Sequence, residues 1–324
     1  MPDTRHHHAT STEDGHGHHG SPQAHAHDHD QAQVLDLDAE VLAEHIASIT
    51  AWLPVRVAPR EIVDLGAGTG AGTFALLGQF PDAHLTAVDS SPGHLERLRS
   101  KVQSAGLSDR VRVAQVDLDT EEWPDLGSPD LVWASASMHH LADPGRALGR
   151  VRDLLAPDGL IAVMELSGLP RFLPPTAPDD SSGLEERCHA ATQQRLAEHM
   201  PHRGADWGPV LTGAGFTVVD SLTVEVNVDG TDENAVGAYA LAALQGIRKA
   251  AAAAISADDL AALDRLLDTA GPDSVLRRDD LAVRTTRTIW VARRTGADQP
   301  FSAAAEAANC ERVLGDRLPG GSGR

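Results

Sequence analysis

Residues 61–73 read EIVDLGAGTGAGT, a short apolar run followed by four glycines at alternate positions. This pattern is typical of a strand that turns tightly into a helix, since glycine lets the backbone bend there and approach a ligand closely. We therefore expect a strand over 61–65 and a ligand-binding turn directly after it. The ligand would be a nucleotide-like molecule.

The residues on either side of this stretch alternate between strand and helix patterns. Helices are predicted over 91–105, which ends at Gly106, and over 144–156, which begins at Pro144 after an Asp143 cap. Short apolar strands separated by amphipathic helices indicate βαβ units and a parallel sheet covered on both faces. The strand candidates in this half are 61–65, 84–89, 111–117, 130–135 and 160–166.

The pattern changes after Leu166, where a loop rich in proline and glycine leads to a helix over 184–200. Two long strands, 216–228 and 281–294, flank a helical region at 232–269. Together with the first five strands they give an α/β fold, a doubly wound, mostly parallel seven-stranded sheet. We expect the domain to span 35–295, with lid or substrate elements at 36–54, 167–207 and 232–269.

Composition narrows the possible functions. The 324 residues contain 27 Lys and Arg against 47 Asp and Glu, a net charge of −20. Such a surface repels phosphate backbones, so nucleic acid is not expected as a partner. Two cysteines give no disulfide framework, and no apolar run reaches the length of a membrane span or a signal peptide. A soluble, cytoplasmic protein is expected, and its oligomeric state stays open.

Both ends of the chain are expected to be flexible. Residues 1–34 hold nine of the 17 histidines and almost no apolar side chain, which predicts a disordered tail. Histidine clusters can chelate metal, but the irregular spacing favours a merely solvated tail, so no metal site is assigned. The helix over 36–54 would begin at an Asp38 cap. Residues 296–324 read as a flexible tail with one weak helix at 301–314.

Two cofactors fit the glycine turn taken alone, a nicotinamide dinucleotide and S-adenosylmethionine. Residues 66–71 satisfy G-x-G-x-x-(G/A), and Asp89 ends the second strand, where either ligand could place a ribose. Further features separate the two. Asp64 precedes the glycines, where it could face an ammonium group but would repel a pyrophosphate. Asp117 ends the third strand, where an adenine amino group could lie.

At this point the chain resembles the class I S-adenosylmethionine-dependent methyltransferases, the small-molecule type of the type 11/12 group. VDLGAGTG (63–70) is similar to that family's first motif, AVDSSPGHLERLR (87–99) to its second and VAQVDLD (113–119) to its third. DLVWASASMHHLADP (130–144) and LGRVRDLLAPDGLIAVME (148–165) resemble the fourth and fifth. The resemblance covers about 36–295 and is strongest over 61–166. Where many members have Gly-Asp in the third motif, this chain has Val116-Asp117.

The resemblance implies a Rossmann-like fold with S-adenosyl-L-methionine as cofactor. It implies that the glycines line the methionine part of the ligand and that Asp64 lies near its amino group. Asp89 would accept hydrogen bonds from both ribose hydroxyls, while Asp117 would hold the adenine amino group. The implied cofactor-binding residues are Asp64, Gly66, Ala67, Gly68, Gly70, Asp89, Ser90, Asp117, Leu118 and Ser135.

Several of these acids also have a plainer interpretation. Asp89 could merely cap the helix that follows it, because Asp-Ser-Ser-Pro is good capping chemistry. Asp117 could cap a loop while Asp119 meets the adenine, and Asp64 could be structural.

His139 and His140 are candidates for a catalytic base. They follow the fourth strand, where cofactor and acceptor should meet, and the ordinary histidine pKa suits proton removal. The HHL sequence is also common in family members with unrelated substrates, which favours a structural role for at least one of them. Glu165 and Asp206-Trp207 are weaker candidates for substrate contact.

The expected activity is transfer of a methyl group to a small-molecule acceptor, of the kind made in specialised metabolism. Phe172, Leu173, Trp207 and Tyr239 suggest a partly apolar acceptor. One alternative is an NAD(P)-dependent oxidoreductase, although the single tyrosine, Tyr239, lacks the Tyr-x-x-x-Lys spacing of the short-chain type. The other is a non-catalytic protein that binds S-adenosylmethionine or metal.

Overall fold

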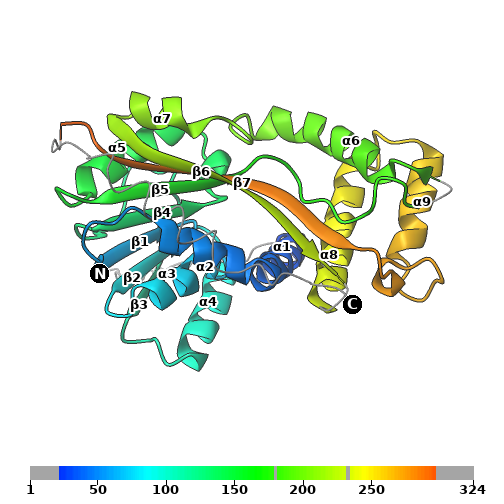
Figure 1. The fold of residues 1–324 in the computed structure, drawn as a ribbon, viewed down its shortest axis with the longest axis horizontal. Helices are drawn as coiled ribbons and strands as arrows, with labels where there is room; N and C mark the ends of the chain where they lie inside the picture. The colour runs from blue at the N-terminus through cyan, green and yellow to red at the C-terminus, as the bar shows by residue number, and fades with distance from the viewer. Residues whose placement is uncertain (1–21, 179–180, 231–233, 297–324) are drawn as a thin grey trace, which may run out of the picture.

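A twisted seven-stranded sheet forms the centre of the molecule (Figure 1). The computed structural model describes residues 22–178, 181–230 and 234–296. The strand order is β3-β2-β1-β4-β5-β7-β6. The strands are β1 (Glu61–Leu65), β2 (His84–Asp89), β3 (Val111–Gln115), β4 (Leu131–Ser135), β5 (Leu160–Leu166), β6 (Phe216–Asp229) and β7 (Ala282–Arg294).

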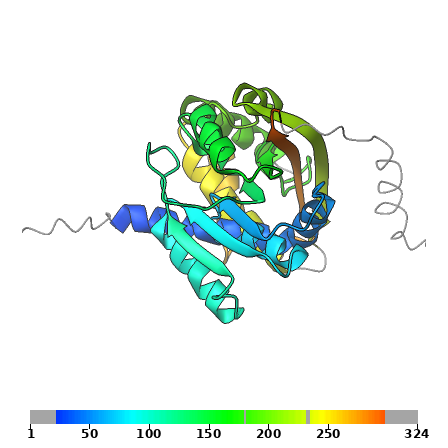
Figure 2. The same ribbon diagram turned by 90° about the vertical axis from the view of Figure 1, so that its left-hand side faces the viewer.

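The pairing confirms the predicted mostly parallel, doubly wound sheet. Strands β1 to β5 pair in parallel, and β7 lies antiparallel between β5 and β6. Figure 2 shows the sheet running from β3 (cyan) at one edge to β6 and β7 at the other. Because parallel strands end at the same edge, the residues that follow β1, β2, β4 and β5 are brought together there.

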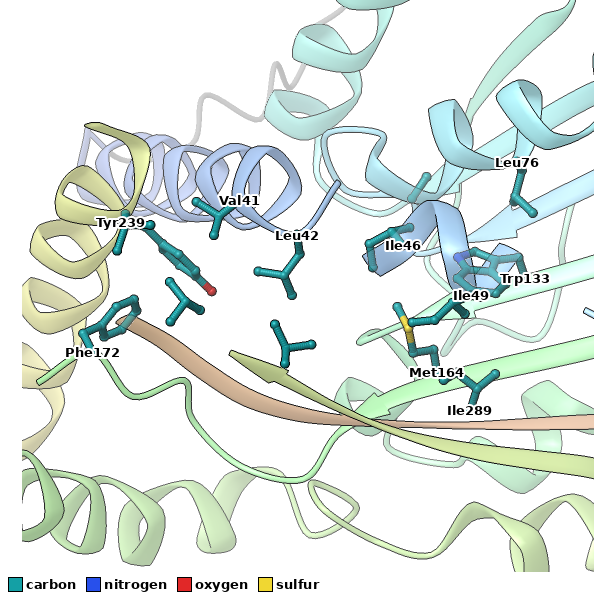
Figure 3. Packing of buried hydrophobic residues seen from close by; sticks show 14 of the residues in the cluster. Val41, Leu42, Ile46, Ile49, Leu76, Trp133, Met164, Phe172, Tyr239 and Ile289 are labelled. Atoms are coloured by element: carbon teal, nitrogen blue, oxygen red, sulfur yellow. The ribbon is translucent and has the colours of Figure 1, made fainter. Parts of the chain in front are cut away.

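Helices cover both faces of the sheet, as the alternation predicts. On one face Leu76 of α3 and Leu98 of α4 join the core with Trp133 and Met164, and on the other Val151 of α5 packs with Val163. Ile46 and Ile49 point toward Trp133, Met164 and Ile289 (Figure 3). The helices of these two layers are α2 (Ala43–Trp52), α3 (Ala71–Gln79), α4 (Pro92–Ser104), α5 (Pro144–Leu154) and α7 (Trp207–Gly213).

A helical lobe extends beyond one end of the sheet (Figure 1). It consists of α6 (Leu184–His199), α8 (Asn234–Ala251) and α9 (Ala257–Leu267), and α1 (Pro22–Val41) packs against α8. The long strands β6 and β7 run from the sheet toward this lobe. One buried core continues from the sheet into the lobe, where Phe172 and Tyr239 meet edge to face with ring centroids 5.0 Å apart.

The N-terminal segment differs from its prediction in three ways. Helix α1 begins at Pro22, so residues 22–34 of the expected disordered tail are helical, while residues 1–21 lie outside the described residues. The helix expected over 36–54 is two helices separated at Leu42. Asp38 is not a cap; it lies inside α1. Ile46 and Ile49 are buried in the core, so α2 belongs to the helices that cover the sheet. Within the segment 36–54, the part that lies in α1 is the remaining candidate for a lid.

The other boundaries agree more closely. Asp143 caps α5 by accepting from the Arg146 N–H, and Gly106 follows α4 in a left-handed conformation. The helical region at 232–269 is two helices, α8 and α9, with Ser256 capping the second. Residues 297–324, including the helix predicted at 301–314, lie outside the described part.

A buried charged cluster fixes α1 to the rest of the structure. The Asp38 carboxylate accepts from the Tyr239 hydroxyl at 2.6 Å and from Arg287 at 2.6 Å, so α1, α8 and β7 meet at one side chain. Arg287 is 4% exposed and Tyr239 is 3% exposed. Burial, and then the Asp38 carboxylate, raise the pKa of Tyr239 well above its ordinary value, so the hydroxyl stays a donor.

Replacing Asp38 with alanine tests this cluster. Since the substitution leaves the Arg287 charge buried without its partner, we expect the free energy of unfolding to fall by about 3–5 kcal/mol. Asp30→Ala is the matched control, because Asp30 pairs with Lys249 from the same helix at an exposed position and should cost at most about 1 kcal/mol. Chemical unfolding followed by circular dichroism measures both, and equal losses would contradict the role given to Asp38.

Candidate active site

The glycine turn after β1 is held against the segment after β4. Gly66 has φ +70°, and a Cβ there would lie 2.3 Å from the Cβ of Ser137. Ser137 also donates from Oγ to the Leu65 carbonyl at 2.8 Å. The Ala67 N–H donates to the Val88 carbonyl at 2.8 Å, which joins the turn to β2. Both neighbours of β1 therefore shape this turn, and only glycine fits at position 66.

Asp89 joins the turn to β2 and α4. Its carboxylate accepts from the Gly68 N–H at 2.8 Å and from the Ser91 N–H at 2.9 Å, and His94 Nδ1 lies 3.4 Å away. Burial favours the neutral acid, but the hydrogen bonds from His94, Ser91 and Gly68 hold the pKa of Asp89 below its ordinary value. An ionised carboxylate therefore faces the glycine turn.

The capping interpretation of Asp89 is not needed to explain α4. Ser91 is the N-cap residue, and its Oγ accepts from the His94 N–H at 3.2 Å. The neighbouring Ser90 is exposed, and its carbonyl accepts from the Gln115 side chain at 3.1 Å.

Asp64 is buried beneath the start of α3. It is 1% exposed, and its Oδ2 accepts from the Thr73 hydroxyl at 2.7 Å. A Cβ on Gly72 would come within 3.2 Å of this carboxylate, so the helix packs directly on it. Burial, opposed by the Thr73 hydroxyl and assisted by the charge of Asp89, raises the pKa of Asp64 to about 7. The hydrogen bond from Thr73 agrees with the interpretation that Asp64 is structural and joins β1 to α3.

The acids after β3 take different positions. Asp117 is exposed, and within the described residues its carboxylate accepts one hydrogen bond, from the Asp119 N–H at 2.9 Å. Asp119 accepts from the Ala142 N–H at 3.0 Å and lies 3.8 Å from Arg146. Because Asp119 already holds the segment after β4, Asp117 has the freer carboxylate. Leu118 between them is buried.

The end of β4 has a strained turn. Ser135 pairs with Met164 of β5, and Ala136 follows with φ +50°, a conformation that residues with a side chain rarely adopt. The Ala136 N–H donates to the Met164 carbonyl at 2.8 Å. Strain of this kind is found mainly where surrounding contacts impose it, and ligand sites are common among such places.

Glu165 and His139 form a buried pair at the same edge. His139 Nδ1 lies 2.6 Å from Glu165 Oε2, and the two side chains are each 2% exposed. Glu165 Oε1 also accepts from the backbone N–H groups of Met138 and His139, at 3.0 and 3.2 Å. The other ring nitrogen, Nε2, faces Arg203 Nη1 at 3.5 Å. The Glu165 carboxylate thus holds the segment after β4 in place through three hydrogen bonds, which leaves it less available to a substrate.

His140 lies beside this pair. Its ring centroid is 4.2 Å from that of His139, and the residue is exposed on its outer side. Desolvation of the ring, and then the neighbouring His139, lower the pKa of His140 to about 4. His139 has its Nδ1 on Glu165, the arrangement that orients a general base, and its Nε2 faces Arg203, whereas the low pKa of His140 makes that ring a weak base. A catalytic role for either histidine stays a prediction.

Helix α1 covers the outer side of the glycine turn. A Cβ on Gly68 would lie 3.2 Å from a methyl group of Leu35. Asp36 pairs with Arg97 and Lys101 of α4, and Lys101 also donates to the Thr69 carbonyl at 3.1 Å. Since Asp36 and Thr69 share Lys101, the position of α1 is linked to that of the turn.

A cleft of about 220 Å³ adjoins Glu165. Its other lining residues are Leu166, Ser167, Gly204, Ala205, Asp206, Thr288 and Trp290. Asp206 caps α7 by accepting from the Gly208 N–H at 3.0 Å. Among the described residues no cluster of three or more His, Cys, Asp or Glu side chains is arranged to hold a metal ion.

The side chains predicted to make the acceptor site apolar are buried elsewhere. Phe172, Leu173, Trp207 and Tyr239 are each at most 3% exposed and pack inside the two cores. They therefore give no support to an apolar acceptor. Four further residues of this edge carry no local sequence signal, because their roles depend on contacts between separate segments: Thr73, Lys101, Ser137 and Arg203.

Comparison with known proteins identifies the domain. Residues 63–161 match the model of the family described as "Methyltransferase domain". A trans-aconitate 2-methyltransferase from Methylobacterium radiotolerans is 36% identical over 117 residues, which are 36% of this chain and 42% of that protein. A malonyl-[acyl-carrier protein] O-methyltransferase from Halorhodospira halophila is 34% identical over 181 residues, 54% of this chain and 58% of that protein.

The chain thus spans about half the length of the curated relatives it matches. The solved structure of the YcgJ protein from Bacillus subtilis aligns with 78% of this chain over its whole length, at 17% sequence identity and a TM-score of 0.47. None of the helices in the described ranges has the length and apolar character needed to cross a membrane. The match over residues 63–161 shows a methyltransferase domain in this stretch of the chain, which runs from β1 into β5.

Proposed function

We propose that the protein transfers the methyl group of S-adenosylmethionine to a small-molecule acceptor. The observation that carries this proposal is the ionised Asp89 carboxylate, hydrogen-bonded to the Gly68 N–H at the carboxyl edge of the sheet. An ionised carboxylate has about four acceptor positions; the Gly68 and Ser91 N–H groups use two, and His94 Nδ1 approaches a third at 3.4 Å. The two ribose hydroxyls would take the open position and that of the longer His94 contact.

The rest of the turn fits the same ligand. Gly66 and Gly68 adopt left-handed conformations, so the backbone presents no side chain toward the ligand side. Asp117 has the free carboxylate proposed for an adenine amino group, and the buried Leu118 lies beside it. Ser135 and the strained Ala136 would border the reacting end.

The cofactor, when bound, supplies a methyl group on a sulfonium that is already activated for transfer. The protein then has to align the acceptor with that methyl group and exclude water, and orientation alone can contribute several kcal/mol. Helix α1, whose Leu35 and Asp36 cover the turn, is the element proposed to close over the ligand. Alignment without strong base catalysis agrees with the low pKa of His140.

The relatives suggest which acceptors to try first. One is named for trans-aconitate and another for a malonyl group on acyl-carrier protein. We propose a small molecule of this general size as acceptor here, a product of specialised metabolism included. The net charge of −20 supports the proposal that nucleic acid is not a partner. A cytoplasmic location remains part of the proposal.

Ligand binding tests the proposal against both alternatives. Calorimetry should show that S-adenosylhomocysteine binds and NADH does not, and Asp89→Ala should weaken binding by roughly 100-fold or more, since two charge-assisted hydrogen bonds are lost. Asp206→Ala is the control, because Asp206 also accepts a backbone N–H but lies at α7. Labelled S-adenosylmethionine with trans-aconitate and related acids then tests transfer. Binding of NADH instead would support an oxidoreductase, and binding without transfer to any acceptor a non-catalytic protein.

The pKa of about 7 at Asp64 separates its two interpretations. If Asp64 faces the ligand amino group, the carboxyl must be ionised to bind it, so the affinity for S-adenosylhomocysteine should rise roughly 10-fold between pH 6 and pH 8. Asp64→Asn should remove this rise. 5′-Methylthioadenosine, which lacks the amino group, should show no such rise with wild-type protein. Identical pH profiles for the two ligands would mean that Asp64 only holds Thr73.

A further inference from the structure

Among the residues that the structure describes, Arg203 has no carboxylate partner, although the protein is rich in acids. The chain has 47 acidic residues against 27 basic ones. Other arginines in the segment 167–207 form ion pairs, such as Arg171 with Glu186 and Arg187 with Asp259. Within residues 22–178, 181–230 and 234–296, Arg203 makes no ion pair within 4.0 Å. In these ranges the polar contact of its guanidinium is with His139 Nε2, 3.5 Å from Nη1.

The nearest acid does not neutralise this guanidinium directly. Glu165 has both oxygens occupied, Oε1 by two backbone N–H groups and Oε2 by His139 Nδ1. The His139 ring therefore stands between Glu165 and Arg203. Burial lowers the pKa of Arg203 and Glu165 raises it, but a guanidinium stays charged in either case. Most of its five N–H donors are left for another partner.

Arg203 lies against the segment after β4, at the edge of the sheet that holds the proposed cofactor site. The charges that act on His140 include both Arg203 and Asp89. The next three residues, 204–206, form one wall of the cleft of about 220 Å³ beside Glu165. Two acids, Glu165 and Asp206, face this cleft, but each is engaged with backbone N–H groups. Ser167 and Thr288 contribute polar groups to its lining.

The contacts of His139 and the low pKa of His140 bear on which acceptor group is methylated. A phenol, alcohol or protonated amine must lose a proton on methylation. His140 is weakly basic, and the one ring nitrogen of His139 that Glu165 does not hold faces the Arg203 guanidinium at 3.5 Å, so the group nearest that nitrogen is a cation that binds anions. A carboxylate is ionised at neutral pH and needs no base. It is also the group that arginine binds most specifically, through two parallel hydrogen bonds.

We propose that the acceptor is a carboxylic acid, held and selected as its anion by Arg203; this rests on the proposed methyltransferase function. One carboxylate oxygen forms the new C–O bond to the methyl carbon as the C–S bond breaks and its electron pair returns to sulfur. The products are a methyl ester and S-adenosylhomocysteine, and no proton is transferred. Arg203 is thus a specificity-determining residue, and His139 with Glu165 is a support that orients it.

The test compares acids with neutral analogues of the same shape. Protein saturated with S-adenosylhomocysteine is titrated by calorimetry with fumarate, citrate, benzoate and trans-aconitate, each beside its amide. The same acids, and a set of phenols and amines, are then offered with labelled S-adenosylmethionine. Label in a methyl ester is released as methanol by alkali, whereas label on a phenol or amine is not, so the readout identifies the acceptor class.

Wild-type protein should bind acids in preference to amides and place the label in alkali-labile form. Arg203→Gln should raise the KM for the acid roughly 10- to 100-fold while leaving the affinity for S-adenosylhomocysteine unchanged. Arg203→Lys should recover part of the loss, because the charge returns without the fork. Arg171→Gln, which removes one positive charge from the same insertion, should behave as wild type.

Some outcomes would overturn the inference alone. They are equal binding of acids and amides, no acid bound, alkali-stable label only, or an Arg203→Gln variant with unchanged acid affinity. The proposed function is tested separately, because its failure would appear as no binding of S-adenosylhomocysteine to the wild-type protein.

Discussion

The Asp89 carboxylate is the interaction on which the site depends. It is the point where β2, the glycine turn and α4 meet, because it accepts from the Gly68 N–H on one side and from the Ser91 N–H on the other. The His94 side chain and these two bonds hold the pKa of the carboxyl below its ordinary value, and the Gly68 bond fixes the turn that follows β1. Ser137 and Glu165 do the same for the segment after β4, through the Leu65 carbonyl and the Met138 and His139 N–H groups. The polar groups at this edge thus hold two loops through direct hydrogen bonds.

Helix α1, which is not part of the sheet, covers the edge where the glycine turn lies. Helix α1 carries Asp36, which pairs with α4 near the glycine turn, and two residues later Asp38, which pairs with Arg287 and Tyr239. One short segment therefore connects the turn to β7 and to α8 in the helical lobe. Any movement of α1 that opens the turn would have to break charged contacts at both positions. Closure of the ligand site and packing of the lobe are in this way parts of one structural unit.

The sequence predicts the sheet well because its signals are local. Apolar strands, the glycines after β1 and the Asp143 cap each act within a few residues, and all appear in the structure as expected. The N-terminal helix was harder, since its histidine-rich start has no apolar periodicity and Asp38 resembles a cap until Arg287, 249 residues away, is seen to bind it. The same holds in the candidate site. Asp89 could be chosen from its place after a strand, whereas Arg203 has no sequence signal and becomes visible only through His139.

The most direct test of this account is a crystal structure of the protein with S-adenosylhomocysteine. The account predicts both ribose hydroxyls on the Asp89 carboxylate, adenine beside Leu118 with its amino group toward Asp117, and the homocysteine part along Gly66 and Gly68. It also predicts that the sulfur lies on the side of the turn that faces Ser135 and His140. A ligand bound away from Asp89, or an Asp89 carboxylate that contacts only Gly68 and Ser91 while the ligand is present, would contradict it.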